Sequence, residues 1–234
     1  MRALLEWRCQ KSIRAKYQNQ IEIYTGIEAD YLKNTVSPSD FAELNLDFCI
    51  GSIHYLQPKR AELPWDFIIS PKVFQEGLND FYDNDIHALI RDYFQANCEM
   101  IEAGGINIIG HCDQIRKFNK GNRFFEESDP IYQKYLHEMF DLIAEKKIIV
   151  EINTRGKLKH LTQNFFPSNS SLKICKDKGI RIMLSADAHK PDECNSYLTE
   201  AAQTALNSGF TKISIIENGK FIEHNIKEFA NVLV

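Results

Sequence analysis

Short apolar runs alternate with longer amphipathic segments along most of the chain. The short runs are rich in isoleucine and end at glycine or at polar residues, which is typical of buried strands. We predict strands at residues 21–27, 46–53, 106–110, 147–152, 180–184 and 211–216. Most of these runs are continuously apolar rather than alternating, which favours a parallel sheet that helices cover.

The segments between these runs carry apolar residues at helical spacing. Asp129 and Pro130 form a helix start, and Gly104 with Gly105 marks a helix end. Helices are predicted at 1–17, 41–44, 71–103 with breaks near Gly77 and Asp83, 129–145, 171–178, 192–207 and 226–233. Residues 57–70 and 153–157 are predicted as loops, and Asn218 with Gly219 as a turn.

Polar side chains recur at the carboxyl ends of the predicted strands, at Glu28, His54, His111, Glu151, Asp187 and His189. In a barrel of parallel strands these ends meet at one rim, whereas an open doubly wound sheet unites only those beside its switch point. We therefore predict an α/β fold of the TIM-like (β/α) barrel type, with residues 1–234 as one domain. No Gly-x-Gly-x-x-Gly or phosphate-loop pattern supports a nucleotide cofactor.

The donors on this rim predict a metal centre. Carboxylate and imidazole groups without thiolates suit Zn²⁺, Mn²⁺ or Fe²⁺. Glu28, His54, His111, Asp187 and His189 are more than one tetrahedral ion needs, so two or three ions are expected, with Glu28 bridging. Such centres hydrolyse phosphate esters, and Asp187 and His189 are the predicted catalytic residues.

Basic residues near the same rim are candidates for binding the phosphate. Arg155, Arg116 and Lys157 are the predicted substrate-binding residues, with Lys159 beside them. Arginine is favoured for its planar fork of donors. The alternative is that these charges are solvated on the surface.

Each predicted ligand also has a structural alternative. His54 and His111 could be hydrogen-bonded polar residues of the core, and Glu28 could be a surface residue. Glu151 could hydrogen-bond loop amides instead of a metal. The order of the whole set along the chain is what favours ligation. Cys112, beside His111, is interpreted as a bystander.

Composition limits the class of protein. A hydrophobic content of 44% is ordinary for a globular core, and the net charge of −4 argues against a dedicated nucleic-acid or membrane binder. No apolar run is long enough for a spanning helix, and the first residues are charged, so we predict a cytoplasmic protein. The six cysteines form no Cys-x-x-Cys pair and are predicted to be reduced thiols.

Five segments in order resemble motifs of the PHP (polymerase and histidinol phosphatase) superfamily, in its histidinol-phosphatase branch. They are GIEADY (26–31), IGSIHYL (50–56), GHCDQIRKF (110–118), EINTRG (151–156) and SADAH (185–189). The resemblance implies a distorted seven-stranded (β/α) barrel, a trinuclear metal centre, and hydrolysis of L-histidinol phosphate in histidine biosynthesis. By position, Glu28, His54, His111, Asp187 and His189 match the family's ligands.

The resemblance has one gap. Family members begin with a His-x-His motif on the first strand and a further histidine after the second, and the sequence contains neither. The expectation is a barrel without its first two βα units and without part of the metal shell. Exposed barrel edges would then favour association of copies.

Three functions remain open from the sequence. The first is a histidinol phosphatase, and the second is a phosphoesterase for another small phosphomonoester or a nucleic-acid end. The third is an inactive domain retained for association. The acidic charge and the lack of a basic and aromatic track favour a small phosphorylated substrate. Metal content separates the third function from the others, and a substrate panel separates the first two.

Overall fold

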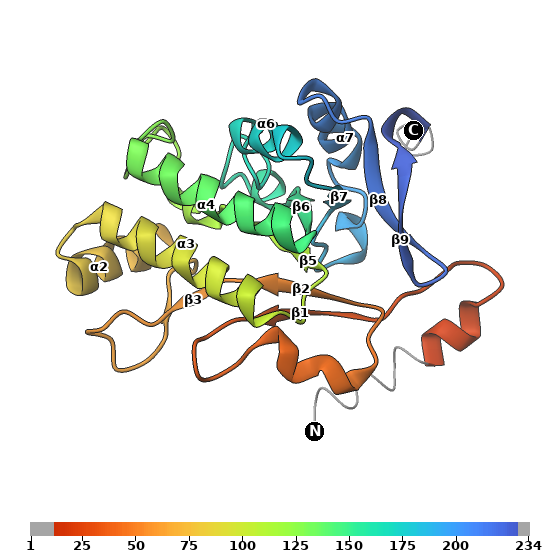
Figure 1. The fold of residues 1–234 in the computed structure, drawn as a ribbon, viewed down its shortest axis with the longest axis horizontal. Helices are drawn as coiled ribbons and strands as arrows, with labels where there is room; N and C mark the ends of the chain where they lie inside the picture. The colour runs from red at the N-terminus through yellow and green to blue at the C-terminus, as the bar shows by residue number, and fades with distance from the viewer. Residues whose placement is uncertain (1–11, 229–234) are drawn as a thin grey trace.

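A computed structural model describes residues 12–228, and its main feature is a parallel sheet of five strands in the order β1-β2-β5-β6-β7 (Figure 1). The strands are β1 (Gly26–Asp30), β2 (Phe48–Ser52), β5 (Ile108–Ile109), β6 (Ile149–Asn153) and β7 (Ile182–Ser185). A short antiparallel pair joins β3 (Tyr55–Leu56) to β4 (Trp65–Asp66), and a hairpin joins β8 (Lys212–Glu217) to β9 (Lys220–Asn225).

The winding of the main sheet is of the barrel type. Each strand pairs in parallel with the next strand of the sheet along the chain, so the order never reverses. A doubly wound sheet would reverse at a switch point. The α/β class and the barrel-type winding are therefore confirmed. The described residues form an arc of five strands, with β8 beside β7 at one end.

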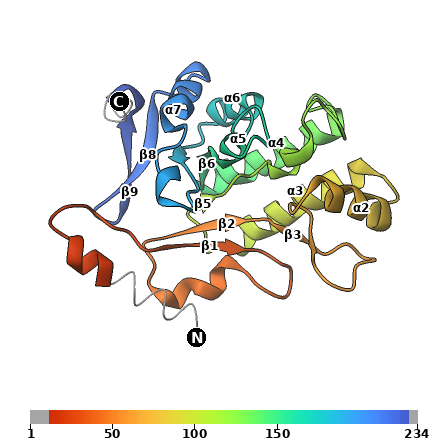
Figure 2. The same ribbon diagram turned by 180° about the vertical axis from the view of Figure 1, so that it is seen from behind.

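The helices that connect the strands are α2 (Pro71–Tyr82), α3 (Ile86–Ala103), α4 (Pro130–Lys146), α5 (Arg155–Leu158), α6 (Asn169–Asp177) and α7 (Leu198–Asn207). Three short 3₁₀ helices are η1 (Pro38–Leu44), η2 (Gln114–Phe118) and η3 (Pro191–Glu193). Helices α3 and α4 lie on the near side of the sheet in Figure 1, and the reverse view shows the sheet from its other side (Figure 2). Side-chain oxygens of Ser70, Asp85, Asp129 and Ser168 cap the starts of α2, α3, α4 and α6.

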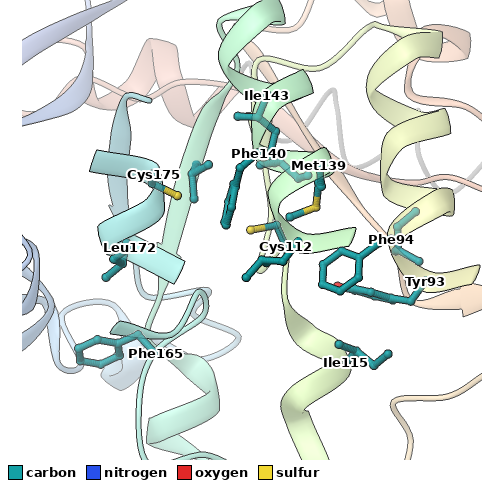
Figure 3. Packing of buried hydrophobic residues seen from close by; sticks show 14 of the residues in the cluster. Tyr93, Phe94, Cys112, Ile115, Met139, Phe140, Ile143, Phe165, Leu172 and Cys175 are labelled. Atoms are coloured by element: carbon teal, nitrogen blue, oxygen red, sulfur yellow. The ribbon is translucent and has the colours of Figure 1, made fainter. Parts of the chain in front are cut away.

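The hydrophobic core lies between the sheet and these helices (Figure 3). Tyr93 and Phe94 of α3 pack edge to face, and Phe94 meets Tyr132 of α4 in the same way. Cys112, predicted to be a bystander, is fully buried in this core. The five cysteines within residues 12–228 are free thiols, and Cys9 lies outside the described residues. Within the same range, no helix combines the length and hydropathy that a bilayer crossing requires.

Several predicted boundaries were wrong. The strand predicted at 21–27 begins only at Gly26, because Ile21 is 60% exposed and has no strand to pair with. The predicted break at Gly77 does not occur: α2 continues, and a Cβ at Gly77 would lie 2.1 Å from the Trp65 ring. This glycine therefore permits close packing. The break at Asp83 is confirmed.

Other departures lie in the second half of the chain. The helix predicted at 192–207 starts only at Leu198, after Tyr197 with a φ of 60°. Residues 155–157 of the loop predicted at 153–157 belong to α5. The turn predicted at Asn218 and Gly219 is observed, and it leads into β9, a strand that was not predicted. Of the two predicted terminal helices, residues 1–11 and 229–234 lie outside the described range.

Candidate metal centre

Three parallel strands bring Glu28, His54 and His111 together. Glu28 lies in β1 opposite Ile50 of β2, and His54 follows the end of β2. His111 comes two residues after Ile109, whose register partner in β2 is Gly51. Parallel pairing in this register places the carboxyl ends of all three strands at one edge. The predicted convergence of these three side chains is therefore observed.

One potential ligand atom from each of the three side chains lies within 3.6 Å of the other two. His54 Nε2 lies 3.2 Å from His111 Nε2, and His111 Nε2 lies 3.1 Å from Glu28 Oε1. The third separation, from His54 Nε2 to Glu28 Oε1, is 3.6 Å. Within residues 12–228, this is the group in which at least three His, Cys, Asp or Glu ligand atoms all lie within 4.8 Å of one another.

These separations fit a metal ion. A tetrahedral zinc ion with bonds of about 2.0–2.1 Å to nitrogen and oxygen keeps its ligand atoms about 3.3 Å apart. The observed distances of 3.1, 3.2 and 3.6 Å lie around that value. Glu28, His54 and His111 could therefore share one ion without large movements.

Asp30 fixes the tautomer of His54. Oδ1 of Asp30 lies 2.7 Å from Nδ1 of His54. A carboxylate only accepts hydrogen bonds, so Nδ1 carries the hydrogen and the lone pair of the neutral ring lies on Nε2. Nε2 is the atom that faces Glu28 and His111. This carboxylate orients His54 as second-sphere partners orient metal-binding histidines.

Glu28 and His111 each stabilise the charged form of the other. Burial alone would raise the pKa of Glu28, but the His111 hydrogen bond, the charges of His111 and His54 and the Ser52 hydroxyl lower this pKa to about 2. Burial lowers the pKa of His111, and the Glu28 hydrogen bond with the charges of Glu151, Glu28 and Asp187 outweighs it, so the pKa is raised. The pocket therefore holds an ionised carboxylate against imidazole nitrogens.

Glu151 accepts two hydrogen bonds beside the three clustered side chains. Its Oε2 accepts the His111 N–H at 2.9 Å and the side-chain amide of Asn153 at 3.1 Å. The same Asn153 amide lies 3.2 Å from Oδ2 of Asp187. Of the two interpretations of Glu151, hydrogen bonding to backbone and loop amides is the one observed. Glu151 therefore joins β6 to His111, and Asn153 of the same strand joins it to Asp187.

Asp187 and His189 line the same cavity as the three clustered ligands. Their ligand atoms are not within 4.8 Å of all those of Glu28, His54 and His111. His189 is 60% exposed, and its Nδ1 lies 3.0 Å from the carbonyl oxygen of Asp187. Asp187 and His111 have φ angles of 49° and 23°, a backbone region that non-glycine residues seldom adopt. Such backbone is common at functional sites.

The cavity has a volume of about 350 Å³. That volume suits a small organic molecule. Its walls combine the clustered ligands with cationic and amide side chains and one aromatic ring. The lining residues that carry functional groups are Glu28, His54, His111, Gln114, Lys117, Asn153, Arg155, Lys159, Phe166, Asp187 and His189.

The predicted phosphate-binding residues divide into two groups. Arg155 lines the cavity, as expected. Lys157 does not; its ammonium pairs with Glu200 and lies over the rings of Phe165 and Tyr197. The prediction that placed Lys157 on the rim was wrong, because α5 turns this side chain toward α7.

Arg116 also lies away from the cavity. Its guanidinium is 4% exposed, donates to Asp113 at 2.8 Å and donates to the carbonyl oxygen of Phe165 at 2.9 Å. The prediction of Arg116 as a rim residue was therefore wrong. Its Nη1 also lies 3.5 Å from Oε1 of the partly exposed Glu127. These partners make Arg116 part of the core of the domain.

Sequence reasoning missed Asp30, Asn153, Gln114 and Lys117 as site residues. Asp30 is two residues after Glu28 on the same strand, so their side chains share one face, and this period-2 spacing could have identified it. Asn153 is the last residue of β6, at the same edge of the sheet as the other candidates. Gln114 and Lys117 belong to η2, whose orientation no sequence pattern indicates.

Residues 8–155 match the model of the PHP domain family, and this span covers more than half of the chain and includes Glu28, His54 and His111. The chain belongs to the PHP domain family. This PHP domain is 26% identical over 204 residues to a Deinococcus radiodurans protein named "Probable histidinol-phosphatase". The match covers 85% of this chain and 70% of that relative.

Two solved structures share the fold of this PHP domain. A Listeria monocytogenes protein with a provisional histidinol phosphatase name gives a TM-score of 0.71 at 20% identity, over 80% of this chain and 71% of that chain. Histidinol phosphate phosphatase from Lactococcus lactis, in complex with zinc, L-histidinol and phosphate, gives 0.62 at 19% identity, over 94% of this chain and 79% of that chain.

Proposed function

We propose that this PHP domain is a metal-dependent phosphomonoester hydrolase whose substrate is L-histidinol phosphate. The observation that carries the proposal is the meeting of Glu28, His54 and His111 in a cavity with cationic walls. The histidinol phosphatase names of its relatives support the choice of substrate. Zinc, histidinol and phosphate in the Lactococcus lactis structure support a metal-dependent reaction on a phosphate ester.

Glu28, His54 and His111 are the residues that would hold a divalent ion, with Asp187 and His189 of the same cavity as further ligands. Zinc, manganese and iron all suit this donor set, and two or three ions are proposed. Such ions would polarise phosphoryl oxygens and supply a hydroxide nucleophile near neutral pH.

The other residues of the cavity position these ligands and the substrate. Asp30 holds His54 in the ligand tautomer, and Glu151 fixes the backbone at His111. Arg155 donates to the carbonyl oxygen of Asp187 at 2.9 Å, so this side chain braces the Asp187 loop at the mouth of the cavity. Cationic groups at that mouth would attract the phosphate dianion.

The test is phosphate release from L-histidinol phosphate by the metal-loaded protein, beside a panel of other small phosphomonoesters. We expect hydrolysis to need added divalent ion and to favour L-histidinol phosphate. His54→Ala and Asp187→Ala should abolish turnover with loss of bound metal. His137→Ala removes an exposed histidine of α4 and should change neither.

Each contrary result has a distinct meaning. Turnover of another ester alone would replace the substrate and keep the reaction. Metal binding without turnover of any ester would reject the hydrolase. Near-normal rates in His54→Ala after loss of metal would reject the metal centre as the catalyst.

A further inference from the structure

Three cationic side chains line the cavity, and one buried carboxylate forms ion pairs with two of them. Oε1 of Glu193 lies 2.6 Å from Nζ of Lys159, and Oε2 lies 3.0 Å from Nη1 of Arg155. Oε2 also accepts the backbone N–H of His189 at 2.9 Å. The Glu193 side chain is only 7% exposed. Both cations are therefore held in an ion-paired network within the protein.

Lys117 is the third cation, and its charge has no such partner. Among residues 12–228, no carboxylate lies within ion-pair distance of its ammonium, and its ring contact is with Phe118, 5.6 Å away. The side chain is partly buried on the cavity wall. Burial is the main cause that lowers the pKa of Lys117. The charge of Asp66 raises this pKa, Arg155 lowers it and Asp187 raises it, and the net shift is downward. The Lys117 ammonium is therefore partly removed from water and forms no ion pair within residues 12–228.

The backbone that carries Lys117 is rigidly held. Its neighbour Arg116 points into the core and binds Asp113 and the carbonyl oxygen of Phe165. Ile115 and Phe118 of the same 3₁₀ helix are buried in the hydrophobic core. With three of its neighbours anchored, η2 presents Lys117 to the cavity from a fixed position.

We propose that Lys117 is the cation that binds the phosphoryl group of the substrate in this cavity. The inference deepens the proposed function and rests on it, because it names a residue of the same site. A dianion gains less from a cation whose hydrogen-bond donors already bind a carboxylate. It gains more from a partly desolvated ammonium without a partner, and charge-assisted hydrogen bonds of this kind contribute strongly to affinity.

The test measures binding of inorganic phosphate to the metal-loaded protein by titration calorimetry at fixed ionic strength. Lys117→Gln should weaken phosphate binding by about tenfold or more, as expected for loss of a charge-assisted hydrogen bond. Lys117→Arg should restore most of the affinity. Lys117→Met keeps the apolar stem and should behave as Lys117→Gln does.

Two matched variants remove one positive charge elsewhere. Lys159→Gln alters the same cavity at a cation already paired with Glu193, and its effect should be about threefold or less. Lys120→Gln removes an exposed charge close by in the chain that does not line this cavity, and should leave affinity unchanged. Metal content and thermal unfolding of every variant show that the fold and the ions are retained.

The outcomes separate this inference from the proposed function. Unchanged phosphate affinity in Lys117→Gln overturns the assignment, and so does a wild-type protein that does not bind phosphate. A larger loss in Lys159→Gln than in Lys117→Gln also overturns it. If phosphate binds through Lys117 but L-histidinol phosphate is not hydrolysed, the proposed function fails and the phosphate site stands.

Discussion

Asp30 and His54 share a hydrogen bond of 2.7 Å between Oδ1 and Nδ1, on the side of the ring opposite Glu28 and His111. This bond determines which nitrogen of His54 is available as a ligand. The two residues follow neighbouring parallel strands, so the sheet itself brings them together. The fold itself therefore sets the orientation of the His54 ring.

Asp30→Asn should weaken metal binding by about 10- to 100-fold, the usual effect of losing a second-sphere carboxylate. The amide keeps the shape of the side chain but no longer accepts a charge-assisted hydrogen bond at full strength. Competition with a chromophoric zinc chelator measures the affinity. Asp177→Asn, an exposed carboxylate of α6, is the control and should bind as the wild type does. Equal affinities for the two variants would refute the role of Asp30.

Added divalent ion should stabilise the folded protein, and chelator should reverse the effect. An ion that binds only the native state at about 100 times its Kd contributes about 2.7 kcal/mol. The melting temperature measured with and without zinc gives the shift. His111→Ala should abolish most of the shift, whereas His137→Ala should keep it. An undiminished shift in His111→Ala would place the bound ion elsewhere.

Gly110 allows the strands to approach closely beneath the ligands. A Cβ at this position would lie 2.5 Å from the Ser52 hydroxyl and 3.0 Å from Cγ2 of Ile50. The Ser52 hydroxyl donates to Glu28 at 2.7 Å. Gly110→Ala should therefore displace Ser52, weaken the anchoring of Glu28 and reduce metal affinity as well as stability.

Gly51→Ala is the matched control for Gly110→Ala. Its Cβ would meet Ile106 at 2.6 Å and Met100 at 2.8 Å, which are packing contacts away from the ligands. Both variants should lose stability by about 1–3 kcal/mol through overpacking. Only Gly110→Ala should lose metal affinity beyond that expected from unfolding. A similar loss in both would show that Ser52 has no special part in holding Glu28.

The sequence predicted the cluster of Glu28, His54 and His111 better than the cationic lining of the cavity. Glu28, His54 and His111 each stand at the end of an apolar run, and the topology of parallel strands then determines where they meet. Arg116 and Lys117 are neighbours in η2, and only the packing of Phe118 and Ile115 decides which of the two faces the cavity. No local pattern contains that information.

Long-range packing also explains the wrong boundary at Gly77. A glycine in a helical pattern lowers intrinsic helix stability, which is why a break was predicted there. The structure instead packs the Trp65 ring against Gly77, although the two residues lie on different elements. The contact depends on the pairing of β4 with β3, and β4 lies within residues 57–70, which were predicted as a loop. Tertiary packing overrides local propensity at this position.

Arg116 provides a test of a structural role against a substrate-binding one. Its guanidinium is 4% exposed and pairs with Asp113, which is itself fully buried. Arg116→Met should leave that carboxylate buried without its partner and cost about 3–5 kcal/mol of stability, measured by urea unfolding. The double variant Asp113→Asn with Arg116→Met should recover part of the loss, because the fully buried position no longer carries a charge. Glu127, the other carboxylate beside Arg116, is 32% exposed and can be solvated. Phosphate affinity of the folded fraction should stay at the wild-type value in both. A stable Arg116→Met protein with weakened phosphate binding would instead show that Arg116 binds the substrate and that its ion pair with Asp113 contributes little to stability.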